Sequence, residues 1–322
     1  MVVVVSTGGT ISMRLDPATG KLVPAVTGEE LVEMLAWPDA PPLELDDFMS
    51  VPSFDVHGER ALALAERARE HARRPDVAGV VVAHGTDTME ETVYLLDRLL
   101  DSETPVVFTG AQRAADARDT DGPRNLRNAI QVASAPAARG RGALIVFAGE
   151  IHAAREVRKV HTSALRAFAS PGYGPIGHVD GDRVVFRALP ERRPPLPVPP
   201  GRIETRVDLL RLYAGSDARF IRASVDSGAR AIVLEGTGRG NANDAVVEGV
   251  REAVAAGVAV VVCSRCAEGR VEPVYGRGGG KDLADAGALF AGDLAGPKAR
   301  TLLQLSLAAG LEPAAAIAAE AG

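Results

Sequence analysis

Short apolar runs alternate along the chain with amphipathic stretches, and polar turns separate them. Residues 80–83 (Val-Val-Val-Ala) form one such run, which suits a central strand covered on both faces. A polar turn follows at 84–88, where Thr88 and Glu91 have the spacing of a helix capping box, and a helical pattern then runs through residues 93–100. The same order of strand, turn and helix recurs, as is typical of a layered α/β domain.

A proline-rich segment interrupts this pattern. Residues 189–200 contain six prolines and few apolar anchors, a composition typical of a linker. A chain of 322 residues also has room for about two domains. We therefore predict a larger N-terminal α/β domain over residues 1–188, a linker over 189–202 and a smaller C-terminal α/β domain over 203–322. Each domain should contain a mainly parallel sheet flanked by helices.

Charge and hydropathy argue against several classes of partner. The 36 basic and 42 acidic residues give a net charge of −6 without long runs, so no basic stripe is available for nucleic acid. No stretch approaches the ~18 apolar residues of a membrane span. Residues 2–5 are too short an apolar run for a signal peptide, and no basic segment precedes them. We predict a cytoplasmic protein with no membrane or nucleic-acid partner.

Cysteines and lysines are few enough to consider singly. Cys263 and Cys266 have the spacing of a redox pair or half a zinc site, but no second pair exists and the six histidines are scattered. Reduced structural thiols are the simpler interpretation, and we expect no cofactor and no metal.

The chain has 32 arginines and only four lysines, at positions 21, 159, 281 and 298. Because a partly buried lysine can release its proton and arginine cannot, each lysine is a mild candidate for chemistry.

Two turns at strand ends carry the candidate functional groups. The first follows the strand at residues 2–5 and contains Gly8 and Gly9, which permit positive φ and a close backbone approach. These glycines do not have the spacing of a nucleotide-binding motif. The second holds Thr86 and Asp87. Ligands bind beyond the carboxyl ends of strands in open α/β sheets, so a small molecule could touch these two residues. Helix capping would also explain a threonine and an aspartate there.

Six segments spread over nearly the whole chain are most informative together. They are Thr7-Gly8-Gly9-Thr10-Ile11, His84-Gly85-Thr86-Asp87-Thr88, Thr109-Gly110-Ala111, Asp121-Gly122-Pro123-x-Asn125-Leu126, Tyr173-Gly174-Pro175 and Lys298-Ala299-Arg300 followed by Leu302-Leu303. In these segments the chain resembles the bacterial-type L-asparaginase/glutaminase family. The resemblance implies hydrolysis of a side-chain amide, L-asparagine to L-aspartate and ammonia, through a threonyl acyl-enzyme. It also implies intimate homodimers, often paired into homotetramers, with sites between subunits.

Catalytic roles follow from the same resemblance. Thr10 matches the family's nucleophile, and Thr86 matches the second threonine, which is grouped with Asp87 and a lysine. Lys159 falls where that lysine is expected. The chemistry is consistent, since a threonine hydroxyl needs a neighbouring base and a lysine amine can act as one. A structural turn, or a surface salt bridge for Lys159, is the plainer alternative for these residues.

Substrate-binding roles are implied for a second set of residues. Ser53 matches a position that holds the substrate carboxylate, and Asp87 would also pair with the substrate ammonium. Backbone N–H groups in the turns at Gly85 and Ala111 could stabilise the oxyanion. Asn241 matches a residue that the second domain of a partner subunit donates. Loop serines and asparagines often bond only their own backbone, which is the alternative for Ser53 and Asn241.

The chain departs from the family pattern in two places. The family usually has a tyrosine in the loop after the nucleophile, but here the loop at residues 14–27 has none, and the vacant position falls near Lys21 or Leu22. Phe54 stands beside Ser53, where a polar residue often helps to hold the substrate. Three explanations are open: an asparaginase in which Lys21 or another loop group replaces the tyrosine, an amidohydrolase for another amide that uses Phe54, or a catalytically weak ligand-binding relative.

Overall fold

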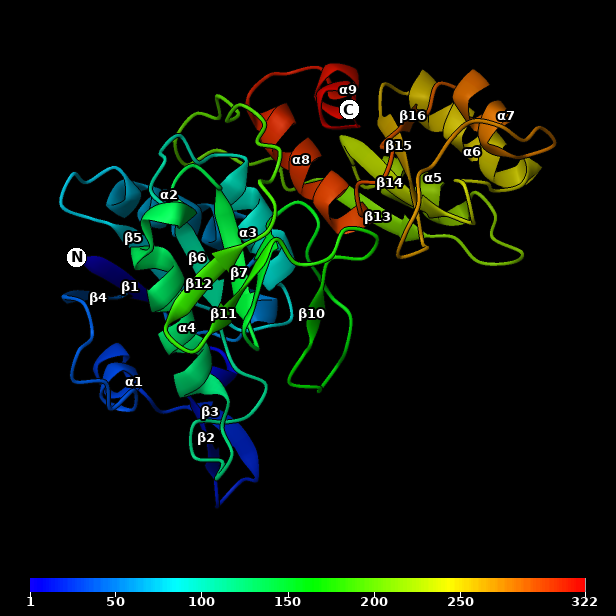
Figure 1. The fold of residues 1–322 in the computed structure, drawn as a ribbon. Helices are drawn as coiled ribbons and strands as arrows, with labels where there is room; N and C mark the ends of the chain where they lie inside the picture. Colours follow the sequence, from blue (N-terminus) through cyan, green and yellow to red (C-terminus); the bar gives the residue numbers. More distant parts are fainter. Residues whose placement is uncertain (322) are drawn as a thin grey trace. The chain divides into compact units, whose positions relative to one another are not determined.

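The computed structural model describes residues 1–321, which belong to two compact units, Met1–Pro195 and Leu196–Gly322. An eight-stranded sheet in the order β12-β11-β8-β7-β6-β5-β1-β4 forms the centre of the N-terminal unit (Figure 1). Its strands are β1 (Val2–Ser6), β4 (Leu43–Asp47), β5 (Gly79–Ala83), β6 (Val106–Thr109), β7 (Ala143–Phe147), β8 (Glu150–Ala153), β11 (Gly177–Asp180) and β12 (Arg183–Phe186). The run from β4 to β7 is parallel, and β8, β11 and β12 continue the sheet antiparallel.

Both faces of the central strands are covered. The helices of this unit are α1 (Gly28–Glu33), α2 (Glu59–Ala72), α3 (Met89–Asp97) and α4 (Gly122–Ser134). Val81 and Ala83 of β5 share one apolar cluster with Leu126 and Ile130 of α4. Because alternate residues of a strand point to opposite faces, Val80 and Val82 pack on the other side, where α2 contacts β5 and α3. The continuous apolar run at 80–83 is therefore a fully buried strand, as predicted.

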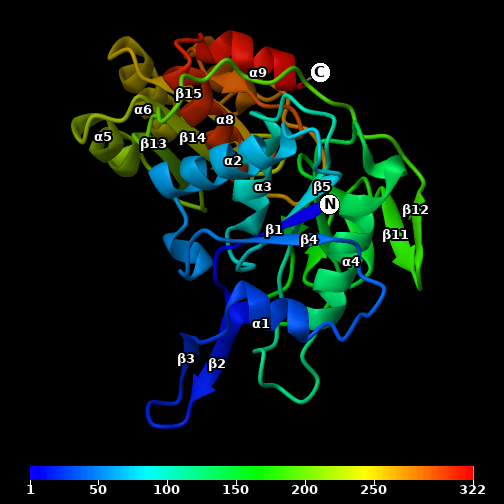
Figure 2. The same ribbon diagram turned by 90° about the vertical axis from the view of Figure 1, so that its left-hand side faces the viewer.

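The segment after the first turn is an antiparallel hairpin of β2 (Met13–Asp16) and β3 (Lys21–Pro24), so the assignment of residues 14–27 as a loop without strands was wrong. Asp16 closes its turn by accepting hydrogen bonds from the Ala18 amide and the Thr19 hydroxyl. Both of these hydrogen bonds are local to the turn. In Figure 2 the hairpin projects away from the sheet beside α1.

The C-terminal unit has a four-stranded, all-parallel sheet in the order β13-β14-β15-β16. Its strands are β13 (Val207–Arg211), β14 (Ala231–Gly236), β15 (Ala259–Ser264) and β16 (Leu289–Phe290), and its helices are α5 (Arg219–Asp226), α6 (Asp244–Ala255), α7 (Gly280–Asp285), α8 (Gly296–Ala308) and α9 (Pro313–Ala321). The predicted class, a larger and a smaller α/β unit with parallel-rich sheets, is confirmed. The exact extent of the linker stays a prediction.

Candidate active site

The two threonine turns meet because β1 and β5 are neighbouring parallel strands, with Ser6 opposite Ala83. Thr7 completes the junction, since both its amide and its hydroxyl donate to the Ala83 carbonyl. Gly9 then lies directly against the second turn: a Cβ built on it would stand 2.4 Å from the Cα of Gly85. Thr10 follows at once, as the first residue of the short 3-10 helix η1 (Thr10–Ser12). The backbone contact between the glycines thus brings Thr10 beside the turn that carries Thr86.

Lys159 completes a group with Thr86 and Asp87. Its Nζ donates to Thr86 Oγ1 at 2.8 Å and to Asp87 Oδ1 at 2.6 Å. The lysine side chain is 15% exposed and that of Asp87 is 58% exposed, so the ion pair is partly shielded from solvent on the lysine side. Lys159 comes from the two-residue strand β9 (Arg158–Lys159), which pairs with β10 (Phe168–Ala169). The structure therefore brings these three predicted residues together from segments more than 70 positions apart in the sequence.

Ser53 lies against the same turn. It begins the short helix η2 (Ser53–Asp55) and is buried. A Cβ on Gly85 would come within 2.8 Å of its side chain, so only glycine allows this approach. Ser53 Oγ accepts the Asp87 amide, and its carbonyl accepts the Thr88 hydroxyl at 2.6 Å. Thr88 is the N-cap residue of α3 but makes no side-chain capping bond, so the predicted capping box is wrong: its hydroxyl holds the Ser53 loop instead.

A third turn borders the site at Ala111. The amide of His84 donates to the Thr109 carbonyl, and a Cβ on Gly110 would stand 2.3 Å from the His84 carbonyl oxygen. Ala111 is buried, and Gly122 packs against both its Cβ and the side chain of Ile11, which follows Thr10. The Ala111 turn therefore lies near the Thr10 turn.

Sequence reasoning gave no role to two side chains that shape this third turn. The Asp121 carboxylate accepts the amides of Gln112 and Arg113 at 3.0–3.1 Å. Asn125 donates to the Gly110 carbonyl and to Asp121, and its Oδ1 accepts the Ala148 amide. The signal was their place in one of the segments that resemble the family, because an aspartate at the start of a helix by itself indicates only an N-cap. Here the Asp121 carboxylate caps the facing turn instead of its own helix.

His84 is the fully buried residue that precedes Gly85. Its Nδ1 lies 2.6 Å from the Gly85 carbonyl, which can only accept, so Nδ1 carries the proton. Burial lowers the pKa of His84 from 6.5 to about 4, because the cation would lose its hydration. The imidazole therefore stays neutral and holds the peptide that leads to Thr86.

The low pKa of His84 predicts acid destabilisation of the N-terminal unit. Between about pH 6.5 and about pH 4 the unfolded chain binds a proton at His84 that the folded chain excludes, so the free energy of unfolding falls as pH falls through this window. The contribution is about 3 kcal/mol. Urea unfolding, followed by the fluorescence of Trp37, the single tryptophan, should show it. In His84→Asn, which keeps a donor for Gly85, the pH slope should flatten; an unchanged slope would contradict the assignment.

Three further predicted residues remain: Lys21, Phe54 and Asn241. Lys21 is exposed and pairs with Asp16 at the far end of the hairpin, about 10 Å of strand from the end that follows Thr10. Its role in place of tyrosine would require the hairpin to fold back, and stays a prediction. Phe54, next to Ser53, is 64% exposed. Asn241 belongs to the C-terminal unit, where its Oδ1 accepts the Gly280 amide and its backbone pairs with Thr237.

The two cysteines belong to the C-terminal unit. Cys263 is buried and Cys266 exposed, both free thiols, and burial raises the pKa of Cys263. Within residues 1–321, no cluster of three or more His, Cys, Asp or Glu side chains is placed to hold a metal ion. Over the same residues, every helix is too short or too polar to cross a membrane.

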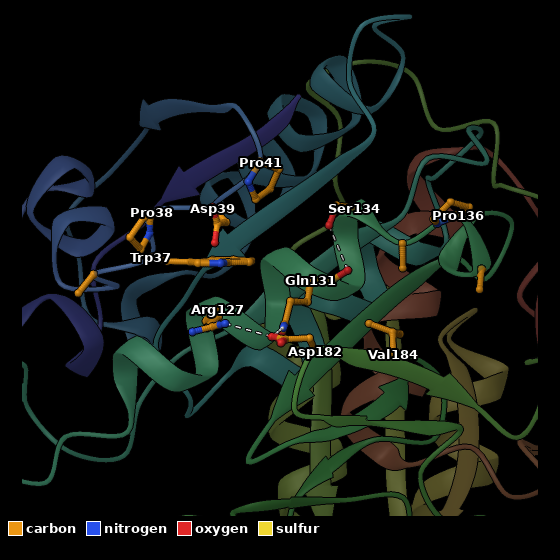
Figure 3. A pocket seen from close by; sticks show the side chains of 13 residues that line it. Trp37, Pro38, Asp39, Pro41, Arg127, Gln131, Ser134, Pro136, Asp182 and Val184 are labelled. Atoms are coloured by element: carbon orange, nitrogen blue, oxygen red, sulfur yellow. Dashed lines mark hydrogen bonds and ion pairs between the residues drawn. The ribbon is translucent and has the colours of Figure 1, made fainter.

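A cleft of about 820 Å³ in the N-terminal unit contains none of the candidate residues. There Arg127 stacks over Trp37 at 4.6 Å and pairs with Asp182 (Figure 3). The cleft is therefore separate from the threonine turns. Trp37 fluorescence can report on unfolding of this unit, because the indole is in direct contact with Arg127 of α4.

Comparison with known proteins identifies the family. Residues 1–192 match the asparaginase N-terminal domain, and residues 206–318 match the glutaminase/asparaginase C-terminal domain. The chain is 36% identical to the L-asparaginase of Bacillus licheniformis (95% of each chain) and 39% identical to a probable L-asparaginase of Deinococcus radiodurans (94% of this chain, 91% of that one). A crystal structure of a probable cytoplasmic L-asparaginase from Campylobacter jejuni superposes with a TM-score of 0.89 at 29% identity, covering 99% of this chain and 98% of the other. The chain belongs to the L-asparaginase family of amidohydrolases.

Proposed function

We propose that this protein hydrolyses L-asparagine to L-aspartate and ammonia through an acyl-enzyme on Thr10. The observation that carries the proposal is the contact of Lys159 Nζ with both Thr86 Oγ1 and Asp87 Oδ1, at the turn against which Gly9 packs. The proposed site therefore combines the hydroxyls of Thr10 and Thr86 with the amine of Lys159, which acts as the base, and the carboxylate of Asp87, which orients that amine.

Acylation requires Thr10 to lose its proton as it attacks. The hydroxyl oxygen forms a bond to the amide carbon while the proton passes by way of Thr86 to Lys159, which acts as the base. The carbonyl oxygen becomes an oxyanion, and backbone N–H groups of the Thr86 and Ala111 turns are its stabilising donors. Cleavage of the carbon–nitrogen bond returns the proton to the departing ammonia. A water molecule then attacks the ester with the same base, releasing L-aspartate and restoring Thr10.

Substrate binding in this proposal uses the groups around the second turn. Asp87 is 58% exposed, so its carboxylate can form an ion pair with the substrate ammonium while Oδ1 still accepts the hydrogen bond from Lys159. Ser53 Oγ accepts the Asp87 amide, which leaves its own proton free to donate to the substrate carboxylate. The exposed ring of Phe54 beside it favours a second candidate, hydrolysis of a larger or less polar amide.

Ammonia release from L-asparagine and L-glutamine tests the proposal. Thr10→Ala and Thr86→Ala should each lower kcat on asparagine by about 10³-fold or more, whereas Thr205→Ala, an exposed threonine of the other unit, should leave it unchanged. If the unaltered protein turns over neither amino acid but forms an acyl adduct on Thr10 with larger amides, the second candidate holds. Ligand binding without acylation would contradict both hydrolytic functions.

We also propose a cytoplasmic homodimer or homotetramer in which a partner subunit supplies Asn241. The match of Asn241 to a family position that a partner subunit donates supports this assembly, and the free thiols are compatible with a reducing compartment. Sedimentation at assay concentration should give a multiple of the 33.5 kDa chain. A monomeric mass in fully active protein would contradict the proposed assembly, and recovery of the native protein outside the cytoplasm would contradict its location.

A further inference from the structure

Lys159 is held by very little regular structure. Its strand, β9, has two residues and pairs on one side only, with β10. On that side the next residue, Val160, donates to the Ala167 carbonyl. The Lys159 amide is directed elsewhere, so its side chain must reach Thr86 from a backbone that the sheet fixes only weakly.

Glu90 supplies the missing anchor. Its Oε2 accepts a hydrogen bond from the backbone N–H of Lys159. A carboxylate is a strong acceptor for an amide, and this one lies between segments 69 positions apart in the sequence. Glu90 is half-buried, as expected for a side chain engaged with a neighbouring strand.

The position of Glu90 in the chain ties this anchor to the reacting groups. It lies in the first turn of α3, which begins at Met89, just after the turn that carries Thr86 and Asp87. Met89 is fully buried and fixes the start of that helix in the core. One short segment, residues 86–90, therefore contacts Lys159 three times: twice at Nζ and once at the backbone amide.

We propose that Glu90 is a positioning residue that sets the place of Lys159 relative to Thr86 and Asp87. Without its acceptor oxygen, the Lys159 amide loses its hydrogen bond to α3, and the backbone from which the lysine side chain extends is held less firmly. A displacement of about 1 Å in a proton-transfer group costs on the order of 10²-fold in rate. The catalytic consequence rests on the function proposed above, but the positioning itself does not.

The scarcity of lysine makes the positioning directly measurable. Protein labelled with ¹³C at lysine Cε should give four signals, from Lys21, Lys159, Lys281 and Lys298. Lys159→Met identifies the Lys159 signal by its loss. Glu90→Ala should move that signal toward those of Lys21 and Lys281, which are exposed, and leave the other three in place. Glu90→Gln keeps an acceptor oxygen and should hold the signal near its original position.

Kinetics on L-asparagine gives the second readout. Glu90→Ala should lower kcat by about 10²-fold with KM changed less than about threefold, and Glu90→Gln should restore most of the rate. Glu59→Ala, in the first turn of α2 and exposed, is the matched control and should change neither readout. An unmoved Lys159 signal in Glu90→Ala, or a Glu90→Gln variant as impaired as Glu90→Ala, would overturn the proposal. If the protein releases no ammonia at all, the lysine signals alone decide it.

Discussion

Replacing Lys159 with methionine is expected to lower kcat for ammonia release from L-asparagine by about 10³-fold or more, in a protein that still folds. Methionine matches the length and apolar stem of lysine, so packing around β9 should persist. It has no amine to accept the threonine proton, and it leaves the buried hydroxyl of Thr86 without the donor at 2.8 Å. Loss of the base should therefore appear in kcat more than in KM.

A second substitution at the same position separates charge from proton transfer. Lys159→Arg keeps a cation for Asp87 but cannot release its proton near neutral pH, so it should be nearly as inactive as Lys159→Met. Lys281→Met is the matched control, since Lys281 pairs with Asp285 on an exposed helix face and should be dispensable. Initial rates of ammonia release with equal amounts of folded protein measure all three. More than about a tenth of the original activity in Lys159→Met would contradict the base assignment.

The parts of the fold that could be predicted are those with local signals. The buried strand at 80–83 and the helix after it are visible in the sequence, because a short apolar run and a helical period each identify their element. The meeting of the Thr10 and Thr86 turns also follows from general rules, since parallel neighbours place their carboxyl ends at one edge.

Contacts between distant segments escaped prediction for a physical reason. Nothing near Glu90 in the sequence indicates that its carboxylate binds the amide of Lys159, and a two-residue strand such as β9 has no periodicity to detect. Lys159 itself was identified through family resemblance rather than through its neighbours. Thr88 shows the opposite error: its local pattern predicted a capping box, but the bond to the Ser53 carbonyl was preferred.

Gly9→Ala is expected to damage both stability and activity, because Gly9 is where the two turns touch. Its φ of 79° and ψ of 178° lie in a region that essentially only glycine occupies, at a strain of about 1–3 kcal/mol for other residues. An added Cβ would also stand 2.4 Å from Gly85 Cα and 2.5 Å from its nitrogen. Both are backbone atoms that cannot rotate away. Relief requires the Thr10 turn to move off the Thr86 turn, and a shift of about 1 Å should cost on the order of 10²-fold in kcat.

Gly140→Ala separates strain from collision. Gly140 also has a positive φ, 74°, but a Cβ there would meet nothing within 4 Å, so this variant should lose only about 1–2 kcal/mol and keep its activity. Urea unfolding followed by Trp37 fluorescence reports on the N-terminal unit, which contains both glycines. Equal losses of stability and unimpaired turnover in the two variants would mean that the Gly9–Gly85 contact does not hold Thr10 in place. A larger loss confined to Gly9→Ala would show that the position of Thr10, the proposed nucleophile, depends on the absence of a Cβ at Gly9.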